Sequence, residues 1–243
     1  MLFVINQEVY SLKGNKNIHI MKQLIFTFVA LFSIVAFSQN IEKDLGEFSQ
    51  LKTFDGLSVE LVKSSSNKVV ISGVHKYDVE IVNKNGLLKI KFNIPKVSTL
   101  YETKIVLFYK ELNLIDANEG SFIFSDEVIK EIDLEIKAQE GAIIRLEVDA
   151  KRVNSRVVSG SIITLSGKAK NQDVVVNSGG IYKAKECITE QTKVSVSTGG
   201  SAKIYATEIA KAKVKAGGVI KIYGNPKLAD TKTVLGGSIT VVE

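Results

Sequence analysis

The sequence predicts an all-β chain that folds as a right-handed, single-stranded parallel β-helix (a solenoid) with an N-terminal β cap. Three observations support this prediction. Glycine recurs about every nineteen residues in the second half of the chain, a short alternating apolar run follows each glycine, and no amphipathic helical pattern of useful length interrupts the repeats. The last observation argues against a leucine-rich repeat or an α/β solenoid, because the repeats of those folds contain helical segments.

The composition fits tight, regular turns. The chain has 243 residues, enough for one elongated domain or two small ones. Hydrophobic residues make up 45%, and there are 18 glycines but only two prolines, Pro95 and Pro226. Disordered chains are usually enriched in both glycine and proline, so this imbalance indicates ordered turns.

The most apolar stretch, residues 24–37, indicates a secretory signal peptide. Lys22 supplies a positive charge before it, and Ala36 and Ser38 place small residues where a signal peptidase reads them. We therefore expect a signal peptide over residues 21–38, with cleavage before Gln39 and a destination in the periplasm, on the outer surface or outside the cell. A membrane anchor or a buried helix is the alternative, but the run has only about fourteen residues and a spanning helix needs about twenty.

Residues 1–20 lie upstream of this signal peptide. The simplest interpretation is a mis-called start, with Met21 as the initiator, so this segment is given no role in the fold. No cysteine follows the apolar run, which speaks against lipid attachment there. No transmembrane span is expected in the mature chain.

The chain after residue 38 is mildly basic. It keeps 29 basic and 25 acidic residues, a formal charge of +4. Such a charge permits an anionic partner without requiring one. The single cysteine, Cys187, excludes an internal disulfide framework, and we expect it to pack inside the solenoid as a small apolar side chain.

Residues 39–110 lack the glycine period but contain strand patterns. Alternating or continuous apolar runs cover residues 57–61, 68–71, 79–82, 87–92 and 104–109. Asn85-Gly86 predicts a hairpin between the third and fourth run, because this pair supplies the positive φ angles that the turn needs. A solenoid needs its open end covered. The region is therefore an N-terminal β cap or a few irregular first coils, and both alternatives remain open.

Residues 111–243 contain the repeats. The leading glycines are separated by 21, 19, 19, 20, 18 and 19 residues, a regularity that chance does not explain. They are Gly120, Gly141, Gly160, Gly179, Gly199, Gly217 and Gly236. We expect each coil to consist of a strand, a glycine bend, a second strand and a looser return, with a rise of about 4.8 Å per coil. Glycine suits the bend because the bend takes a positive φ and because neighbouring coils approach closely there. The handedness of parallel crossovers favours a right-handed coil.

Aligning the repeats on the leading glycine sorts the other positions into columns. The columns three and five residues before and after the glycine are mostly β-branched or small. Positions that differ by two share one face of a pleated strand, so we expect these columns to stack in the interior.

The column two residues after the glycine is apolar although strict alternation turns it outward. Its apolar members are Phe122, Ile143, Ile162, Ile181 and Val219. Either the bend rotates these side chains inward at a corner, or they form an exposed apolar ladder that serves as an interface. We favour the corner, because exposed apolar ladders of this size are rare except at interfaces.

The outward column four residues after the glycine holds the main candidate binding residues, Arg145, Lys183, Lys203 and Lys221. The three lysines lie on consecutive coils, about 5 Å apart, and stacked like charges add no stability. The column suits an anionic glycan, lipopolysaccharide or another envelope surface component, or it simply keeps the β surface soluble.

Tyr205 and Tyr223 share the column six residues after the glycine. They are candidates for stacking on sugar rings, although packing between coils also accounts for them.

The sequence carries no clear catalytic, metal or cofactor signature. Polysaccharide hydrolysis needs paired carboxylates, and the nearest approach is Glu119 and Glu140, which share the column before the glycine. His19 lies in the leader and His75 stands alone, so no metal or nucleophilic site is expected. The Gly-Gly pairs do not precede helices, so no phosphate loop is expected. No cofactor is expected, and nucleic acid is an unsuitable partner for an exported chain without a binding motif.

Several short motifs, taken in order, resemble one known family. They are residues 54–59 (Phe-Asp-Gly-Leu-Ser-Val), residues 85–90 (Asn-Gly-Leu-Leu-Lys-Ile), residues 105–107 and the glycine ladder that follows. Together they resemble the secreted head GIN domain proteins of Bacteroidetes-type bacteria, which are named as autotransporter adhesin heads. The resemblance covers nearly all of the mature chain and implies a right-handed parallel β-helix.

These observations favour a secreted, non-enzymatic β-helical protein of the envelope or cell surface, an adhesin-like binding module. One alternative is a carbohydrate-active enzyme, a polysaccharide lyase or hydrolase whose acids converge only in three dimensions. Another is a structural assembly module that uses the apolar column. Three carboxylates converging in a groove would contradict the non-enzymatic interpretation.

Overall fold

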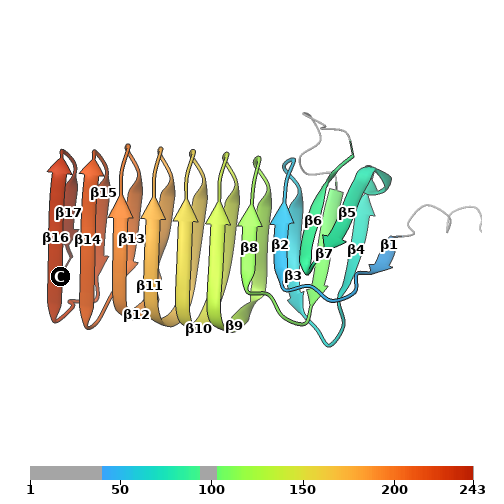
Figure 1. Cartoon of the computed structure of the whole chain (residues 1–243), viewed down its shortest axis with the longest axis horizontal. Coiled ribbons are helices and arrows are strands. Elements are labelled where there is room, and N and C mark those ends of the chain that lie inside the picture. The colour runs from blue at the N-terminus through green and yellow to red at the C-terminus, as the bar shows by residue number, and fades with distance from the viewer. Residues whose placement is uncertain (1–39, 94–102, 243) are drawn as a thin grey trace, which may run out of the picture. The chain divides into compact units, whose positions relative to one another are not determined.

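A computed structural model describes residues 40–93 and 103–242 (Figure 1). The signal peptide predicted over residues 21–38 and the mis-called start predicted over residues 1–20 both lie outside the described residues. Within the described ranges, no helix combines the length and the apolar character that crossing a bilayer would require.

The described chain consists almost entirely of strands, with one 3-10 turn, η2 (Lys76–Asp78). The strands are β1 (Ile41–Asp44), β2 (Gln50–Thr53), β3 (Ser58–Lys63), β4 (Lys68–Gly73), β5 (Val79–Lys84), β6 (Leu87–Phe92), β7 (Thr103–Tyr109), β8 (Leu114–Ala117), β9 (Phe122–Ala138), β10 (Ile143–Val157), β11 (Ile162–Val176), β12 (Ile181–Val196), β13 (Ser201–Tyr205), β14 (Ile209–Ala216), β15 (Val219–Tyr223), β16 (Leu228–Leu235) and β17 (Ser238–Val241).

The repeats stack in parallel, so the predicted all-β solenoid is confirmed. Ile144 on β10 pairs with Ile163 on β11, and Val157 pairs with Val176, each nineteen residues further along the chain. Parallel pairing of equivalent positions continues from β9 to β10, across a bulge between Arg145 and Glu147, and from β12 through β13 and β14 to β17. Each coil therefore adds one strand to each of two faces, which we call the ladder face (N-terminal halves of β9–β12, then β13, β15 and β17) and the groove face (C-terminal halves of β9–β12, then β14 and β16).

The predicted interior columns are buried in the first six repeats. Ile123, Ile144, Ile163 and Ile220 lie three residues after their glycines and are fully buried. The columns before the glycine behave in the same way up to Val214. In the last coil the equivalent positions, Thr231 and Thr233, are exposed. The interior is thus apolar where coils cover both sides and polar where the described chain ends.

The five bends from Gly120 to Gly199 are two-residue turns in which the leading glycine and the residue before it both have positive φ, whereas the last two have positive φ at Gly217-Gly218 and Gly236-Gly237. Ser178 and Gly179 have φ angles of 49° and 71°, and the Gly180 amide donates to the Asn177 carbonyl over 2.9 Å. This is the geometry of a type I′ turn, whose first position tolerates a non-glycine residue and whose second favours glycine. The predicted positive φ is confirmed at all seven leading glycines.

The predicted close approach occurs at the second glycine of each pair rather than at the first. A Cβ on Gly179 would meet nothing within 4 Å, whereas a Cβ on Gly180 would lie 2.6 Å from the backbone oxygen of Val157 in the preceding coil. The positive φ therefore favours glycine at the first residue of the pair, and the close approach of the preceding coil requires glycine at the second.

The expectation of a looser return is wrong for the central coils. β10 runs from Ile143 to Val157 without a break, and it pairs with β11 on both sides of the corner, at Asp149 with Lys168 and at Arg152 with Asn171. Since each coil stacks on its neighbours, the parallel hydrogen bonds between coils continue on both sides of the corner, and the strand is not interrupted there. Only later, between β13 and β14, does the return become a short break at residues 206–208.

The inward corner expected for the apolar column is also wrong. Phe122, Ile143, Ile162 and Ile181 pair in one straight row, and none is buried; Ile143 is 40% exposed and Val219 is 37% exposed. The pleat resumes directly after the type I′ turn, so the alternation of the strand is kept and the column points outward.

The chain before Gly120 contributes one further turn in register with the repeats. Asp55-Gly56 between β2 and β3 has φ angles of 58° and 68°, and the Gly56 amide donates to the Glu119 carbonyl over 2.8 Å. β2 pairs in parallel with β8, and β3 pairs with β9, although more than fifty residues separate them (Figure 1).

The segment between β3 and β8 closes this end of the sheet. β4 pairs with β7 in antiparallel fashion, β5 and β6 form the predicted Asn85-Gly86 hairpin, and β1 lies against β4. β6 and β7 still pair in parallel with β2 and β3, and antiparallel strands replace parallel coils only beyond them, at β5 and β4.

Candidate functional site

The predicted basic column lies on the ladder face. Lys183, Lys203 and Lys221 pair with one another in consecutive coils. Among the residues that the structure describes, no carboxylate lies within ion-pair distance of these three lysines. They therefore form a row of unneutralised charge on a straight strand surface.

Arg145 differs from the three lysines of its column. Its guanidinium lies 3.7 Å from an Asp126 carboxylate oxygen and within 6.0 Å of the ring centroids of Phe122 and Phe124. These contacts hold the guanidinium against the protein, and Thr164 separates Arg145 from the lysines. The structure thus brings three of the four predicted basic residues into one continuous row.

The two tyrosines are neighbours but are packed. Tyr205 pairs with Tyr223 in the next coil, and both are half-buried. A Cβ on Gly224 would lie 2.5 Å from the Tyr205 ring, so that ring lies against the backbone of the next coil. This contact favours cross-coil packing over an open platform for sugar rings.

The groove face carries a basic hollow that the sequence columns did not single out. It has a volume of about 520 Å³ and spans β11, β12, β14 and β16. Its basic lining residues are Lys193, Lys211, Lys213, Lys215 and Lys232. Short side chains such as Val175, Ser195 and Ser197 lie between these long ones. We call this site the basic groove.

The strand pattern explains why these lysines point together. On β14, Ala210, Ala212 and Val214 are buried, which turns Lys211, Lys213 and Lys215 to the outside. Lys213 then pairs with Lys232 on β16. A Lys-X-Lys-X-Lys run on one strand was the available sequence signal, since alternate residues share a face.

The charge in the basic groove is only partly neutralised. Lys193 lies 3.5 Å from Asp173, its registered neighbour one coil earlier. In the described part of the chain, Lys211, Lys213, Lys215 and Lys232 have no carboxylate within ion-pair distance. Four free ammonium groups therefore face a concave surface.

Further hollows continue the basic groove towards the N-terminal coils. One of about 320 Å³ shares Asp173, Lys193 and Lys211 with it and adds Arg152. Another of about 170 Å³ shares Asp173 and adds Arg156 and Lys137. Together they form a trough that crosses the coils on the groove face.

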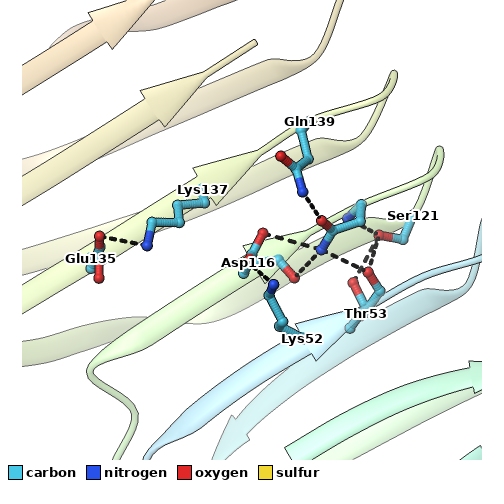
Figure 2. Close-up of polar contacts among 8 residues, drawn as sticks. Lys52, Thr53, Asp116, Ser121, Glu135, Lys137 and Gln139 are labelled. Carbon is cyan, nitrogen blue, oxygen red and sulfur yellow. Dashed lines mark hydrogen bonds and ion pairs between the residues drawn. The ribbon is translucent and has the colours of Figure 1, made fainter. Parts of the chain in front are cut away.

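A satisfied polar network lies where β2 meets β8 (Figure 2). Lys52 pairs with the buried Asp116 over 3.0 Å, and the Asn118 amide donates to Asp116 Oδ1 over 3.1 Å and to the Thr53 carbonyl over 3.2 Å. The Thr53 and Ser121 hydroxyls lie 2.8 Å apart. Since these polar groups have protein partners, the network serves to join the early turn to the first repeat.

Three carboxylates do come together, but at turns rather than in a groove; Glu119 and Glu140 are exposed and Asp55 is half-buried. Asp55, Glu119 and Glu140 occupy the first turn position in consecutive coils. Partial burial, a hydrogen bond to Asp55 and the charges of Asp55 and Glu140 raise the pKa of Glu119. Across residues 40–93 and 103–242, no cluster of His, Cys, Asp and Glu is arranged to hold a metal ion.

Cys187 packs inside the solenoid, as expected. Its side chain is fully buried, and burial raises the pKa of its thiol to about 12. The thiol is therefore protonated and shielded at neutral pH.

A protein-family model described as "Putative auto-transporter adhesin, head GIN domain" matches residues 47–226. The chain belongs to this family. The match begins before the Asp55-Gly56 turn and ends after β15, so it includes both the early turn and the glycine repeats. No curated protein matches the chain significantly.

Three solved structures of similar fold come from Bacteroides and Parabacteroides species. A "putative adhesin" from Bacteroides fragilis is 17% identical, with a TM-score of 0.76 over 84% of this chain and 96% of that one. A "putative adhesin" from Parabacteroides merdae is 17% identical, with a TM-score of 0.70 over 86% and 97%. A "Putative lipid binding protein" from Parabacteroides distasonis is 16% identical, with a TM-score of 0.66 over 86% and 98%. At these identities the likeness concerns the fold, and the head GIN membership points to a surface or secreted protein.

Proposed function

We propose that this head GIN protein is a secreted, non-enzymatic adhesin-type module that binds an anionic polysaccharide in the basic groove. The observation that carries the proposal is the set of four lysines, Lys211, Lys213, Lys215 and Lys232, that line a hollow without carboxylate partners. Unneutralised charge in a concave site attracts ions of opposite sign more strongly than the same charge on a flat surface.

The geometry of the groove suits a chain-like ligand. Its hollows cross successive coils, and lysines recur at the spacing of the coils, about 4.8 Å. Short side chains between the lysines leave room for sugar rings, and Asn177 and Ser197 add hydrogen-bonding groups to the lining. A polymer with repeated carboxylate or sulfate groups would meet several ammonium groups at once.

The carboxylates of the groove support binding rather than hydrolysis. Asp173 and Asp230 share one column, with Lys193 and Lys211 registered between them. Three coil steps separate the two acids by about 14 Å. Glycosidases place their paired carboxylates about 5 to 9.5 Å apart, so these acids are too distant to act as a pair.

The test compares two triple variants of equal charge. Lys211→Gln/Lys213→Gln/Lys215→Gln removes three charges from the basic groove, and Lys183→Gln/Lys203→Gln/Lys221→Gln removes three from the ladder face. Both triplets contain two exposed lysines and one half-buried lysine. The probes are short oligogalacturonate and heparin oligosaccharides, titrated calorimetrically and analysed per chain, with a neutral maltooligosaccharide as the blank.

We expect the groove variant to lose about tenfold in affinity, since three exposed charge contacts contribute roughly 1.5 kcal/mol together. The ladder-face variant should retain the affinity, and raising the salt concentration should weaken the wild type. Equal losses of affinity in both variants would show that the interaction is a non-specific electrostatic attraction. The proposal would be contradicted if neither acidic probe bound the protein. It would also be contradicted if either probe were cleaved to give new reducing ends.

A further inference from the structure

The trough on the groove face has a second positive end, remote from the lysines of the basic groove. The hollow of about 170 Å³ at this end is lined by Arg156 and Lys137, which are registered neighbours in consecutive coils. Lys137 lies 2.7 Å from Glu135, which neutralises it. Within the described ranges, no carboxylate lies within ion-pair distance of Arg156, and this residue is exposed. Arg156 is therefore a free positive charge at the N-terminal end of the trough.

Arg156 shares one outward column with a lysine of the basic groove. Arg156 pairs with Val175 on the next coil, and Val175 pairs with Ser195. Ser195 pairs in turn with Lys213, which lines the basic groove. Three coil steps therefore separate Arg156 from Lys213, about 14 Å at the usual spacing of parallel strands. Val175 lines the hollows at both ends, so the two positive ends belong to one continuous surface.

The floor between the two positive ends carries no net charge. Val175 and Ser195 are uncharged and half-buried, so they offer a small apolar surface and a hydroxyl group. Beside them, Asp173 and Lys193 neutralise each other over 3.5 Å. The floor thus suits neutral sugar residues better than acidic ones, because none of these four residues offers a free positive charge.

We infer that the trough selects an acidic heteropolysaccharide in which neutral sugars separate the acidic ones. This inference rests on the proposed function and adds the spacing of the charges. A 1,4-linked pyranose residue in an extended chain is about as long as one coil rise, so three coil steps correspond to about three sugar residues. An acidic sugar at Lys213 therefore places the third sugar beyond it at Arg156, with neutral sugars over Val175 and Ser195. A polymer charged on every residue would place uncompensated carboxylates over the floor.

The test uses two tetragalacturonates that each keep two free carboxylates and are methyl-esterified at the other residues. The spaced probe has its carboxylates on the first and fourth residues, and the adjacent probe has them on the first and second. Arg156→Gln should weaken binding of the spaced probe by about threefold, as expected for one exposed charge contact, and leave binding of the adjacent probe unchanged. Adjacent carboxylates can both lie at the lysines of the basic groove, whereas only the spaced pair also reaches Arg156. Isothermal titration calorimetry measures both affinities.

Arg145→Gln is the matched control, since Arg145 is an exposed arginine on the ladder face and its loss should affect neither probe. Circular dichroism of both variants checks the fold. The fully acidic tetragalacturonate separates this inference from the proposed function. If the wild type does not bind it, the proposed function fails and this inference fails with it. If the wild type binds it, but Arg156→Gln does not weaken the spaced probe more than the adjacent one, only this inference is overturned.

Discussion

At the scale of single residues, the glycine pair separates two physical requirements that sequence alone merges. The leading glycine has a left-handed backbone with open space around it, and the following residue lies against the preceding coil. Where the second position is not glycine it is small and buried, as at Ser121, Ala142 and Ser161. The repeat thus specifies a conformation at one position and a size at the next.

This division predicts different costs for two adjacent alanine substitutions. Gly179→Ala should destabilise the fold by about 1 kcal/mol, because only the left-handed conformation opposes it. Gly180→Ala should cost more, because its Cβ would lie 2.6 Å from Val157 O and adjacent coils would have to separate. Urea unfolding of both variants measures the difference, and an equal or larger loss for Gly179→Ala would disprove this account.

At the scale of elements, the stacked turns determine where like charges meet. Asp55, Glu119 and Glu140 occupy one row because the type I′ turn repeats in register. Later turns place Ser159, Ser178 and Thr198 in that row. The acid stack is therefore confined to the first turns, and its energetic effect depends on pH.

The raised pKa of Glu119 predicts the sign of that effect. A carboxyl group whose pKa is higher in the folded state binds its proton more tightly there, so its contribution to stability is greatest at acidic pH and is lost as the pH rises through the folded-state pKa. Glu119→Gln should therefore stabilise the protein near neutral pH and have a smaller effect at about pH 3.5, below the ordinary glutamate value.

Urea unfolding at the two pH values checks this prediction. Glu186→Gln is the control. The Glu186 carboxylate lies 3.2 Å from the Lys185 ammonium, so this substitution removes a favourable contact and should not stabilise the protein at neutral pH. A stabilisation by Glu119→Gln that is larger at acidic than at neutral pH would reverse the predicted sign.

The two faces show how far strand patterns can be predicted from the sequence. Period-two alternation correctly placed the interior columns, from Ile123 to Ile220, because burial selects apolar residues there. The same rule also turned Phe122 and Ile143 outward, and the preference for a buried corner overrode it wrongly. The basic groove was not predictable in the same way, because its concavity depends on how long and short side chains alternate across β11, β12, β14 and β16.

At the scale of the whole chain, the parts predictable from sequence are those with a local period. Gly120 to Gly236 recur at nearly constant spacing, and parallel stacking follows from that spacing. The Asp55-Gly56 turn lies 64 residues before Gly120, so no period connects it to the ladder. Its place in the stack depends on contacts such as Lys52 with Asp116, which join positions remote in sequence.

The charge distribution is likewise a property of the whole chain. A formal charge of +4 after residue 38 conceals an acidic stretch over residues 103–150 and a basic stretch over residues 151–242. The basic groove draws on this separation, because its lysines lie on the later coils.

The early turn also has a consequence for the order in which the chain folds. Repeat coils close loops of about nineteen residues, whereas β2 pairs with β6 and β8, 37 and 64 residues further along the chain, at extra entropic costs of about 0.6 and 1 kcal/mol. Nucleation should therefore begin among β9–β12, with β2 and β3 added afterwards although they come first in the chain. Pulse-labelling hydrogen exchange during refolding should show β10 and β11 amides protected before those of β2 and β3, and the opposite order would refute it. A chain that enters a compartment N-terminus first would then carry β2 and β3 unpaired at least until their nearer partners, β6 and β7, arrive.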